Sequence, residues 1–238
     1  CGTTACPSDI DSCNGWNPTD IFVRTYDKKK EFTKSFAFRM KTDSEKKLTR
    51  NTGFYERTSK LTRNFVDARG FWLPNDYTKH GVINEYTACR EKAVVIDLSS
   101  LRKFEILGPD AEELMNYTLT RNIKKLSVGQ IVYSAMCYEN GTMFDDGTLL
   151  KLSETGFRWV CGDEYAGEWL KEQAKKKNYK VVIKNSTDQI NNISLQGPNS
   201  RKILEKIIFT PPTQPTISEL QWFRFTICRL EELNGIPL

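Results

Sequence analysis

Between residues 131 and 161, three short apolar segments alternate with turn signals, and this spacing limits the fold more than any other feature of the sequence. The segments predicted as strands are 131–137, 148–152 and 157–161. Asn140-Gly141 lies between the first two, and Asn-Gly is the dipeptide that most strongly favours a tight hairpin turn. The turn Glu154-Thr155-Gly156 separates the second pair. The sequence therefore predicts a block of hairpin-connected strands.

Helices and further strands surround this block without a repeated strand–helix–strand period. Asp110 is placed to cap a helix that has Glu112 and Glu113 in its first turn. The segment 164–177 is amphipathic, with Trp169 and Leu170 facing inward. The other predicted helices are 85–95, 111–117 and 200–208, and the other strands 94–96, 103–107, 179–184, 190–196 and 220–230. This order predicts an α+β fold rather than a doubly wound sheet.

Composition indicates two regions in a globular chain of 238 residues, of which 39% are hydrophobic and 27% charged. Residues 1–45 are polar and predict an arm or linker, whereas 46–238 have a domain-like pattern. The chain begins with Cys1 rather than Met, which suggests a processed or fragmentary N-terminus without a signal peptide. Apolar runs of a few residues are too short for a transmembrane helix.

Cysteine and histidine usage excludes several classes of site. Cys89, Cys137, Cys161 and Cys228 are scattered through apolar stretches, which predicts buried free thiols of a reducing compartment, either cytoplasm or mitochondrial matrix. Three further cysteines near the N-terminus do not complete the ligand set of a zinc site. His80 is the single histidine and lies in a polar, turn-like stretch, so we expect it at the surface rather than in a catalytic triad.

The net charge of +5 is spread along the chain, with short lysine clusters at 28–30 and 175–177. Runs of this length are typical of solvated surface, and they are also compatible with steering of an anionic ligand. Neither a glycine-rich dinucleotide motif nor a P-loop is present, and no standard RNA-binding motif occurs. Nucleic acid and membrane are therefore not expected as partners.

Several motifs, taken in order, resemble the T-protein (aminomethyltransferase) superfamily of the glycine cleavage system. The resemblance covers residues 50–238 and also extends to the folate domains of sarcosine and dimethylglycine oxidases. The matching segments are Thr52-Gly53-Phe54-Tyr55-Glu56-Arg57-Thr58, Ile96-Asp97-Leu98-Ser99, Leu107-Gly108-Pro109-Asp110-Ala111, Val132-Tyr133-Ser134-Ala135-Met136-Cys137, Phe144-Asp145-Asp146-Gly147 and Leu195-Gln196-Gly197-Pro198. The last of these precedes a predicted helix.

The resemblance implies a cloverleaf of three subdomains around a tetrahydrofolate pocket. In this chain it implies the front two subdomains, with the C-terminal barrel absent. Asp146 matches the family aspartate beside the N5/N10 edge of the folate, and is the predicted catalytic residue. Tyr133 matches a tyrosine of the same pocket, while Leu101 and Val160 match apolar positions that sandwich the pterin. The predicted cofactor is tetrahydrofolate, and the predicted metal is none.

The residue types agree with that chemistry and also allow plainer interpretations. A carboxylate beside N5 can stabilise developing positive charge or relay a proton. Taken by itself, however, Asp145-Asp146-Gly147 is also an ordinary turn sequence. Tyr133 could instead pack in the core, where Trp169 and Trp222 are expected. Trp159 is expected in the core as well, or beside the pterin.

Two functions follow from the resemblance. The first is a tetrahydrofolate-dependent aminomethyl or methyl transferase, or a demethylase, whose partners are a small one-carbon donor or a lipoyl carrier protein. The second is a non-catalytic subunit that acts as an interaction or scaffold module in a larger assembly. The first rests on Asp146 and Tyr133 in the family's register and is the favoured function. The second rests on the long polar arm and on the truncation, since the family segment resembling Ser-Arg-Thr-Gly-Tyr-Thr-Gly-Glu does not occur within the 238 residues. In addition, Leu150 stands where a tyrosine is common. A partner chain could supply the missing part.

Overall fold

The computed structural model describes residues 50–238, which include the whole predicted site. Residues 51–238 form one compact unit. The predicted polar arm, 1–45, lies outside the described residues, so its boundary remains a prediction. Within the described part, no helix is long and apolar enough to cross a membrane.

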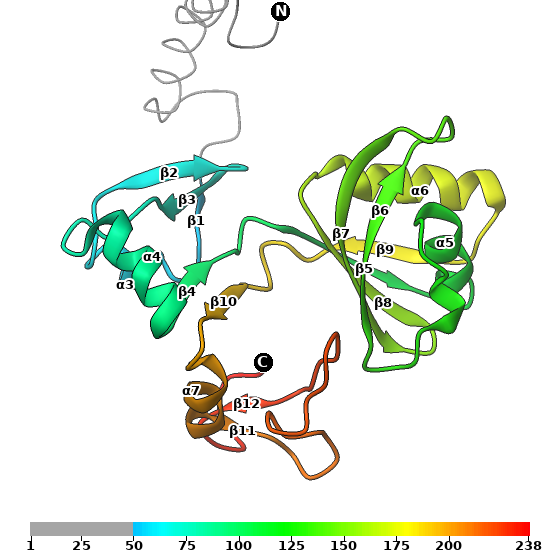
Figure 1. Cartoon of the computed structure of the whole chain (residues 1–238). Helices are drawn as coiled ribbons and strands as arrows, with labels where there is room; N and C mark the ends of the chain where they lie inside the picture. The colour runs from blue at the N-terminus through cyan, green and yellow to red at the C-terminus, as the bar shows by residue number, and fades with distance from the viewer. Residues whose placement is uncertain (1–49) are drawn as a thin grey trace, which may run out of the picture. The chain divides into compact units, whose positions relative to one another are not determined.

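The first elements form a small sheet and two helices (Figure 1). Strands β2 (Phe65–Ala68) and β3 (Phe71–Pro74) make an antiparallel hairpin, and β1 (Arg50–Asn51) lies on the other side of β3. Helices α3 (Tyr55–Thr58) and α4 (Gly81–Glu91) follow β1 and β3. Strand β4 (Val94–Asp97) pairs antiparallel with the distant β10 (Ile193–Gln196). Helix α4 thus begins and ends four residues earlier than predicted.

The central feature is a five-stranded antiparallel sheet in the order β6-β7-β8-β5-β9. Its strands are β5 (Arg102–Leu107), β6 (Ile131–Cys137), β7 (Met143–Ser153), β8 (Gly156–Cys161) and β9 (Val182–Asn185). The hairpins predicted at Asn140-Gly141 and Glu154-Thr155-Gly156 connect β6 to β7 and β7 to β8, which confirms the β-rich block and the α+β class. Gly141 has φ of +84°, as the turn requires.

One face of this sheet carries the hydrophobic core. Helices α5 (Ala111–Thr118) and α6 (Tyr165–Lys177) cover that face (Figure 1), and the short helix η1 (Ile123–Lys125) follows α5. A row of core residues crosses the strands, from Val132 through Leu149 and Trp159 to Phe104. The inward placement of Trp169 and Leu170 on α6 is confirmed. We call this the core face, and the other side the open face.

The last segment is less regular than its apolar sequence suggested. Helix α7 (Ser200–Ile207) and strand β11 (Ile208–Phe209) follow β10, and β11 pairs with β12 (Arg229–Leu230). The predicted strand 220–230 is wrong except for these last two residues. Phe223 has φ of +54°, which breaks an extended chain, and Trp222 is 88% exposed rather than in the core.

Three local predictions need correction. Asp110 precedes α5, but its carboxylate does not cap the helix and instead accepts a hydrogen bond from the Lys180 N–H at 2.7 Å. The Asp145-Asp146-Gly147 segment lies inside strand β7 rather than in a turn, because pairing with β6 extends β7 at its start. Of the four cysteines in the described part, all are free, but Cys89 and Cys137 are only half-buried. The surface position of His80 is confirmed.

Candidate functional site

The open face brings three of the four predicted site residues together. Because neighbouring strands are in register, Tyr133 of β6 pairs with Thr148 of β7, Thr148 with Val160 of β8, and Val160 with Lys103 of β5. These residues form a row that crosses four strands on the side away from α5 and α6. Asp146 precedes Thr148 by two positions, so its side chain projects from the same face of β7.

Tyr133 and Asp146 contact each other directly. The Tyr133 hydroxyl donates a hydrogen bond to Oδ2 of Asp146. This bond raises the pKa of Tyr133 because the neighbouring carboxylate accepts the phenol proton and favours the neutral phenol. Tyr133 is 50% exposed, which overturns the alternative that it packs in the core. The pair is therefore a solvent-facing carboxylate held in place by a tyrosine.

The adjacent aspartate has a different task. Oδ1 of Asp145 accepts hydrogen bonds from the N–H groups of Asp146 at 2.9 Å and Gly162 at 3.3 Å. Its Oδ2 accepts one from the N–H of Asp163 at 3.0 Å. The Asp145 carboxylate thus connects the start of β7 to the loop after β8. Asp146 is the member of the pair that faces outward, and its role in the site stays a prediction.

Gly147 allows β7 to approach β8 closely at this point. A Cβ atom at position 147 would overlap the carbonyl oxygen of Val160 and lie 3.0 Å from the ring of Trp159. No side chain therefore fits there without moving β8. The glycine that follows the two aspartates is a packing requirement, and it sets the spacing between Asp146 and the row that contains Val160.

Leu101 lies outside the sheet, in the turn that leads into β5. Its N–H donates to the carbonyl of Leu98 at 3.0 Å, and its own carbonyl accepts from Lys103 Nζ at 2.8 Å. Leu101 is half-buried. The structure thus connects Leu101 to the open face through Lys103, whereas Tyr133, Asp146 and Val160 belong to the sheet itself.

Trp159 does not belong to the site. It is fully buried on the core face, whereas Val160, one residue later, is half-buried on the open face. The interpretation that placed Trp159 beside the ligand is wrong, because successive side chains of a strand point to opposite faces. Its other interpretation, as a core residue, is confirmed.

Sequence reasoning missed two residues of this region. Lys103 is 1% exposed although it is charged, and it extends the row on the open face. Arg121 precedes η1, and its Nε donates to the backbone carbonyl of Tyr133 at 3.3 Å. The one sequence feature that could have indicated Lys103 is the occurrence of a charged residue in the predicted strand 103–107. Arg121 gave no signal, because the contact depends on a chain segment that pairs with the edge of β6.

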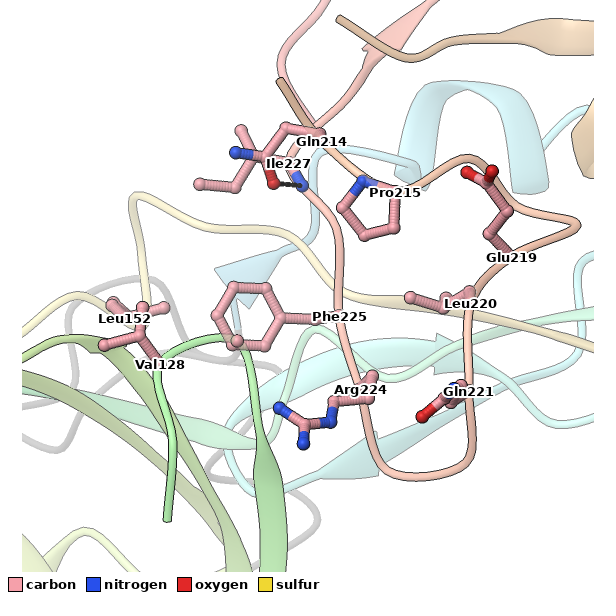
Figure 2. A pocket seen from close by; sticks show the side chains of 11 residues that line it. Val128, Leu152, Gln214, Pro215, Glu219, Leu220, Gln221, Arg224, Phe225 and Ile227 are labelled. Carbon is pink, nitrogen blue, oxygen red and sulfur yellow. Dashed lines mark hydrogen bonds between the residues drawn. The ribbon is translucent and has the colours of Figure 1, made fainter. Parts of the chain in front are cut away.

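A separate groove lies between the loop that precedes β6 and the C-terminal segment. Its volume is about 410 Å³, and Figure 2 shows Phe225 and Arg224 beside Val128 and Leu152. Backbone hydrogen bonds hold the segment there, from the Phe225 N–H to the carbonyl of Gly129 at 3.1 Å, for example. None of the four predicted site residues lines this groove. It is therefore distinct from the site on the open face.

An apolar, an aromatic and an acidic side chain share the open face. Val160 supplies an apolar surface, Tyr133 an aromatic one, and Asp146 a solvent-facing carboxylate for a nitrogen that gains positive charge. Among residues 50–238, no group of three or more histidine, cysteine or acidic side chains is placed to hold a metal ion. The side chains of Val160, Tyr133 and Asp146 are of types that can bind a ligand and accept or donate a proton.

Comparison with known families decides the relationship. The model of the GCVT N-terminal domain matches residues 54–237, nearly the whole described part. The chain belongs to the T-protein superfamily. The resemblance inferred from short motifs is thereby confirmed, and so is the family's folate-binding type of domain as the fold. The T-protein-like α+β architecture places Asp146 and Tyr133 on adjacent strands of one sheet.

Individual relatives span this T-protein-like chain to different extents. It is 51% identical over its entire length to a trimethylamine-oxide aldolase of Ruegeria pomeroyi, and it spans 30% of that protein. It is 34% identical to an aminomethyltransferase of Alkaliphilus metalliredigens, over 66% of this chain and 41% of the relative. The crystal structure of aminomethyltransferase T from Bartonella henselae matches with a TM-score of 0.58 and 26% identity, over 66% of this chain and 43% of that one.

Proposed function

We propose that this chain carries the tetrahydrofolate site of a one-carbon transfer enzyme, with Asp146 as the catalytic carboxylate. The observation that carries the proposal is the Tyr133–Asp146 pair, which projects from the open face beside Val160. The neighbouring carboxylate of Asp145 accepts hydrogen bonds from three backbone N–H groups. Asp146 therefore differs from its neighbour in β7 by facing outward.

The residues would divide the work as follows. Bound tetrahydrofolate supplies the secondary amine N5, which takes up the one-carbon unit. Asp146 stabilises the positive charge that develops beside it, or accepts the proton that the amine loses. Tyr133 fixes the orientation of that carboxylate by donating its phenolic proton. Val160 and Leu101 would supply the apolar surfaces for the flat ring of the pterin.

The favoured one-carbon donor is a methylated amine or its oxide rather than an aminomethyl group on a lipoyl carrier. The support is the higher identity, 51% over the whole chain, to a relative named for trimethylamine oxide, against 34% to an aminomethyltransferase. Aldol-type cleavage of trimethylamine oxide into dimethylamine leaves one carbon at the oxidation level of formaldehyde. Tetrahydrofolate is a chemically suitable acceptor for that unit.

The second candidate function is a non-catalytic interaction or scaffold module. It is supported by Leu150 of β7, which stands where a tyrosine is common in the family. A pull-down with this chain distinguishes the two: a stable protein partner without any effect of folate supports the scaffold, and micromolar folate binding contradicts it.

Calorimetric titration of the chain with tetrahydrofolate tests the first proposal. Asp146→Asn removes the charge and keeps the shape, and should weaken binding by roughly tenfold to a hundredfold, the value of a hydrogen bond to a charged group. Glu168→Gln is the matched control, because it removes an exposed carboxylate from α6, on the core face. Equal affinities of the unchanged chain and the Asp146→Asn variant would contradict the assigned role.

A further inference from the structure

Lys103 is a buried ammonium group whose hydrogen bonds lead to one turn. Nζ donates to the carbonyl of Ser99 at 3.0 Å and to the carbonyl of Leu101 at 2.8 Å. The side chain is 1% exposed. Burying a charged group is unfavourable unless its hydrogen bonds are satisfied, so these two bonds are the evident reason that the position tolerates lysine.

The turn that Lys103 holds is also fixed at other points. The Ser99 N–H donates to Oδ1 of Asp97 at 2.9 Å, and Ser99 Oγ accepts from the N–H of Asn192 at 3.0 Å. The Leu101 N–H closes the turn on the carbonyl of Leu98. Lys103 is the contact that connects the turn to the sheet row of Val160 and Tyr133, because its own backbone belongs to that row.

A second buried lysine on the same sheet provides a comparison. Lys151 of β7 is 4% exposed and lies on the core face, where Nζ contacts Glu112 at 2.7 Å and Glu154 at 3.3 Å. Its carboxylate partners raise its pKa, with the hydrogen bond to Glu112 as the main cause. Lys103, whose hydrogen bonds go to backbone carbonyls, is in a different electrostatic position, and it lies on the open face.

We propose that Lys103 is a positioning residue for the ligand site: its buried amino group holds the turn at Leu101 against strand β5, so that Leu101 forms a fixed wall beside Val160. This inference rests on the proposed function, because Leu101 and Val160 are the apolar walls of the tetrahydrofolate site. Lys103 does not touch the ligand and acts through the Leu101 carbonyl.

The charge of Lys103 links this wall to pH. Burial lowers the pKa of Lys103 to about 8 from its ordinary value of 10.5. The carboxylates of Asp97 and Asp188 oppose the shift, and the guanidinium groups of Arg102 and Arg158 add to it. The closed turn therefore favours the neutral amine over the ammonium, whereas a turn opened to water would leave Lys103 near its ordinary pKa. Loss of the proton above pH 8 favours the closed turn, so the wall is firmest there.

The first test measures the dissociation constant of tetrahydrofolate from pH 6.5 to 9.5, for the unchanged chain and for Lys103→Met. The unchanged chain should bind about threefold to tenfold more tightly at pH 9.5 than at pH 6.5, because loss of the proton from Lys103 favours the closed turn. Lys103→Met should bind weakly at both extremes. Lys151→Met, which removes a buried lysine from the other face, should keep the pH profile of the unchanged chain.

The second test follows the turn without any ligand. Amide hydrogen exchange at Leu101, corrected for the intrinsic dependence on pH, should accelerate in Lys103→Met and should slow in the unchanged chain above pH 8. Exchange at Ile106, in the middle of β5, serves as the internal reference because it reports on the sheet. This measurement uses the unchanged chain as well, so it holds even where Lys103→Met folds poorly.

The outcomes separate the two proposals. An unchanged chain that fails to bind tetrahydrofolate contradicts the proposed function, and also the role of Leu101 as a wall of that site. Tight binding that shows the same pH profile in Lys103→Met as in the unchanged chain contradicts the positioning role alone. Unaltered exchange at Leu101 in the variant overturns the structural basis of the inference, whatever the affinity.

Discussion

Asp145 and Asp146 are consecutive in β7, yet their carboxylates serve opposite faces of the sheet. Asp145 accepts the backbone N–H groups of Gly162 and Asp163, whereas Asp146 accepts the hydroxyl of Tyr133. The alternation of a strand is sufficient to separate the two roles. One carboxylate stabilises the loop after β8, and its neighbour is left to face a ligand.

The two aspartates should therefore respond differently to the same substitution. Asp145→Asn leaves the N–H groups with one carbonyl oxygen and brings an amide donor against them, and should lower the free energy of unfolding by about 1–3 kcal/mol. Asp146→Asn, at an exposed position, should change it by less than about 0.5 kcal/mol. Urea titration measures both values, and equal losses would argue against the division of roles.

Tyr133→Phe tests the orientation of the Asp146 carboxylate. The change removes the phenolic hydroxyl and keeps the ring, so the carboxylate loses its donor. We expect tetrahydrofolate binding or turnover to fall by about threefold to tenfold, the value of an ordinary hydrogen bond, with little effect on unfolding. Tyr138→Phe is the control, because it alters a tyrosine that packs against Phe144 and Trp169 near the other end of β6. Identical behaviour of the two variants would contradict the role of Tyr133.

Gly147→Ala tests the close approach of β7 and β8. The added Cβ would overlap the carbonyl oxygen of Val160, so one strand must move. We expect a loss of about 1–3 kcal/mol in the free energy of unfolding, typical of overpacking a well-packed interior. Thermal and urea unfolding measure this loss, and a variant as stable as the unchanged chain would show that the strands separate easily here.

Lys103 should give stability a specific dependence on pH. Its pKa is about 8 in the folded chain and 10.5 when unperturbed, so between these values the unfolded chain binds the proton that the folded chain has lost. Stability contributed by this group therefore rises with pH across that window. The difference in unfolding free energy between the unchanged chain and Lys103→Met should increase from pH 8 to 10, and a flat difference would contradict the lowered pKa.

The parts of the fold that local signals specify were predictable. The boundaries of β6 agree with those predicted, because apolar residues end at an Asn-Gly turn that closes the hairpin. Helix α6 follows from its amphipathic period. The segment 220–230 did not follow, because Phe223 turns it out of the extended region and its pairing with residues 129–131 is limited to an isolated bridge, between Gln130 and Arg224.

The site was predictable to the extent that it lies in continuous motifs. Tyr133 and Asp146 came from family motifs and Val160 from a matching apolar position. Strand register brings the three to one face, although their assignment to a folate ligand stays a proposal. Lys103 and Arg121 could not be found in this way. Their importance arises from contacts to backbone carbonyls, at Leu101 and at Tyr133, and such contacts depend on tertiary structure rather than on residue pattern.

The alternation of Trp159 and Val160 along β8 has a consequence for folding fidelity. The core and the site depend on the same strands, because successive residues of each strand face opposite sides of the sheet. A slip of a single residue would carry Asp146 and Lys103 into the hydrophobic interior and expel Trp159 into water. A chain with slipped register thus has a less stable core even without a ligand. The fraction of molecules that can bind the ligand would then report the fraction with the correct strand register.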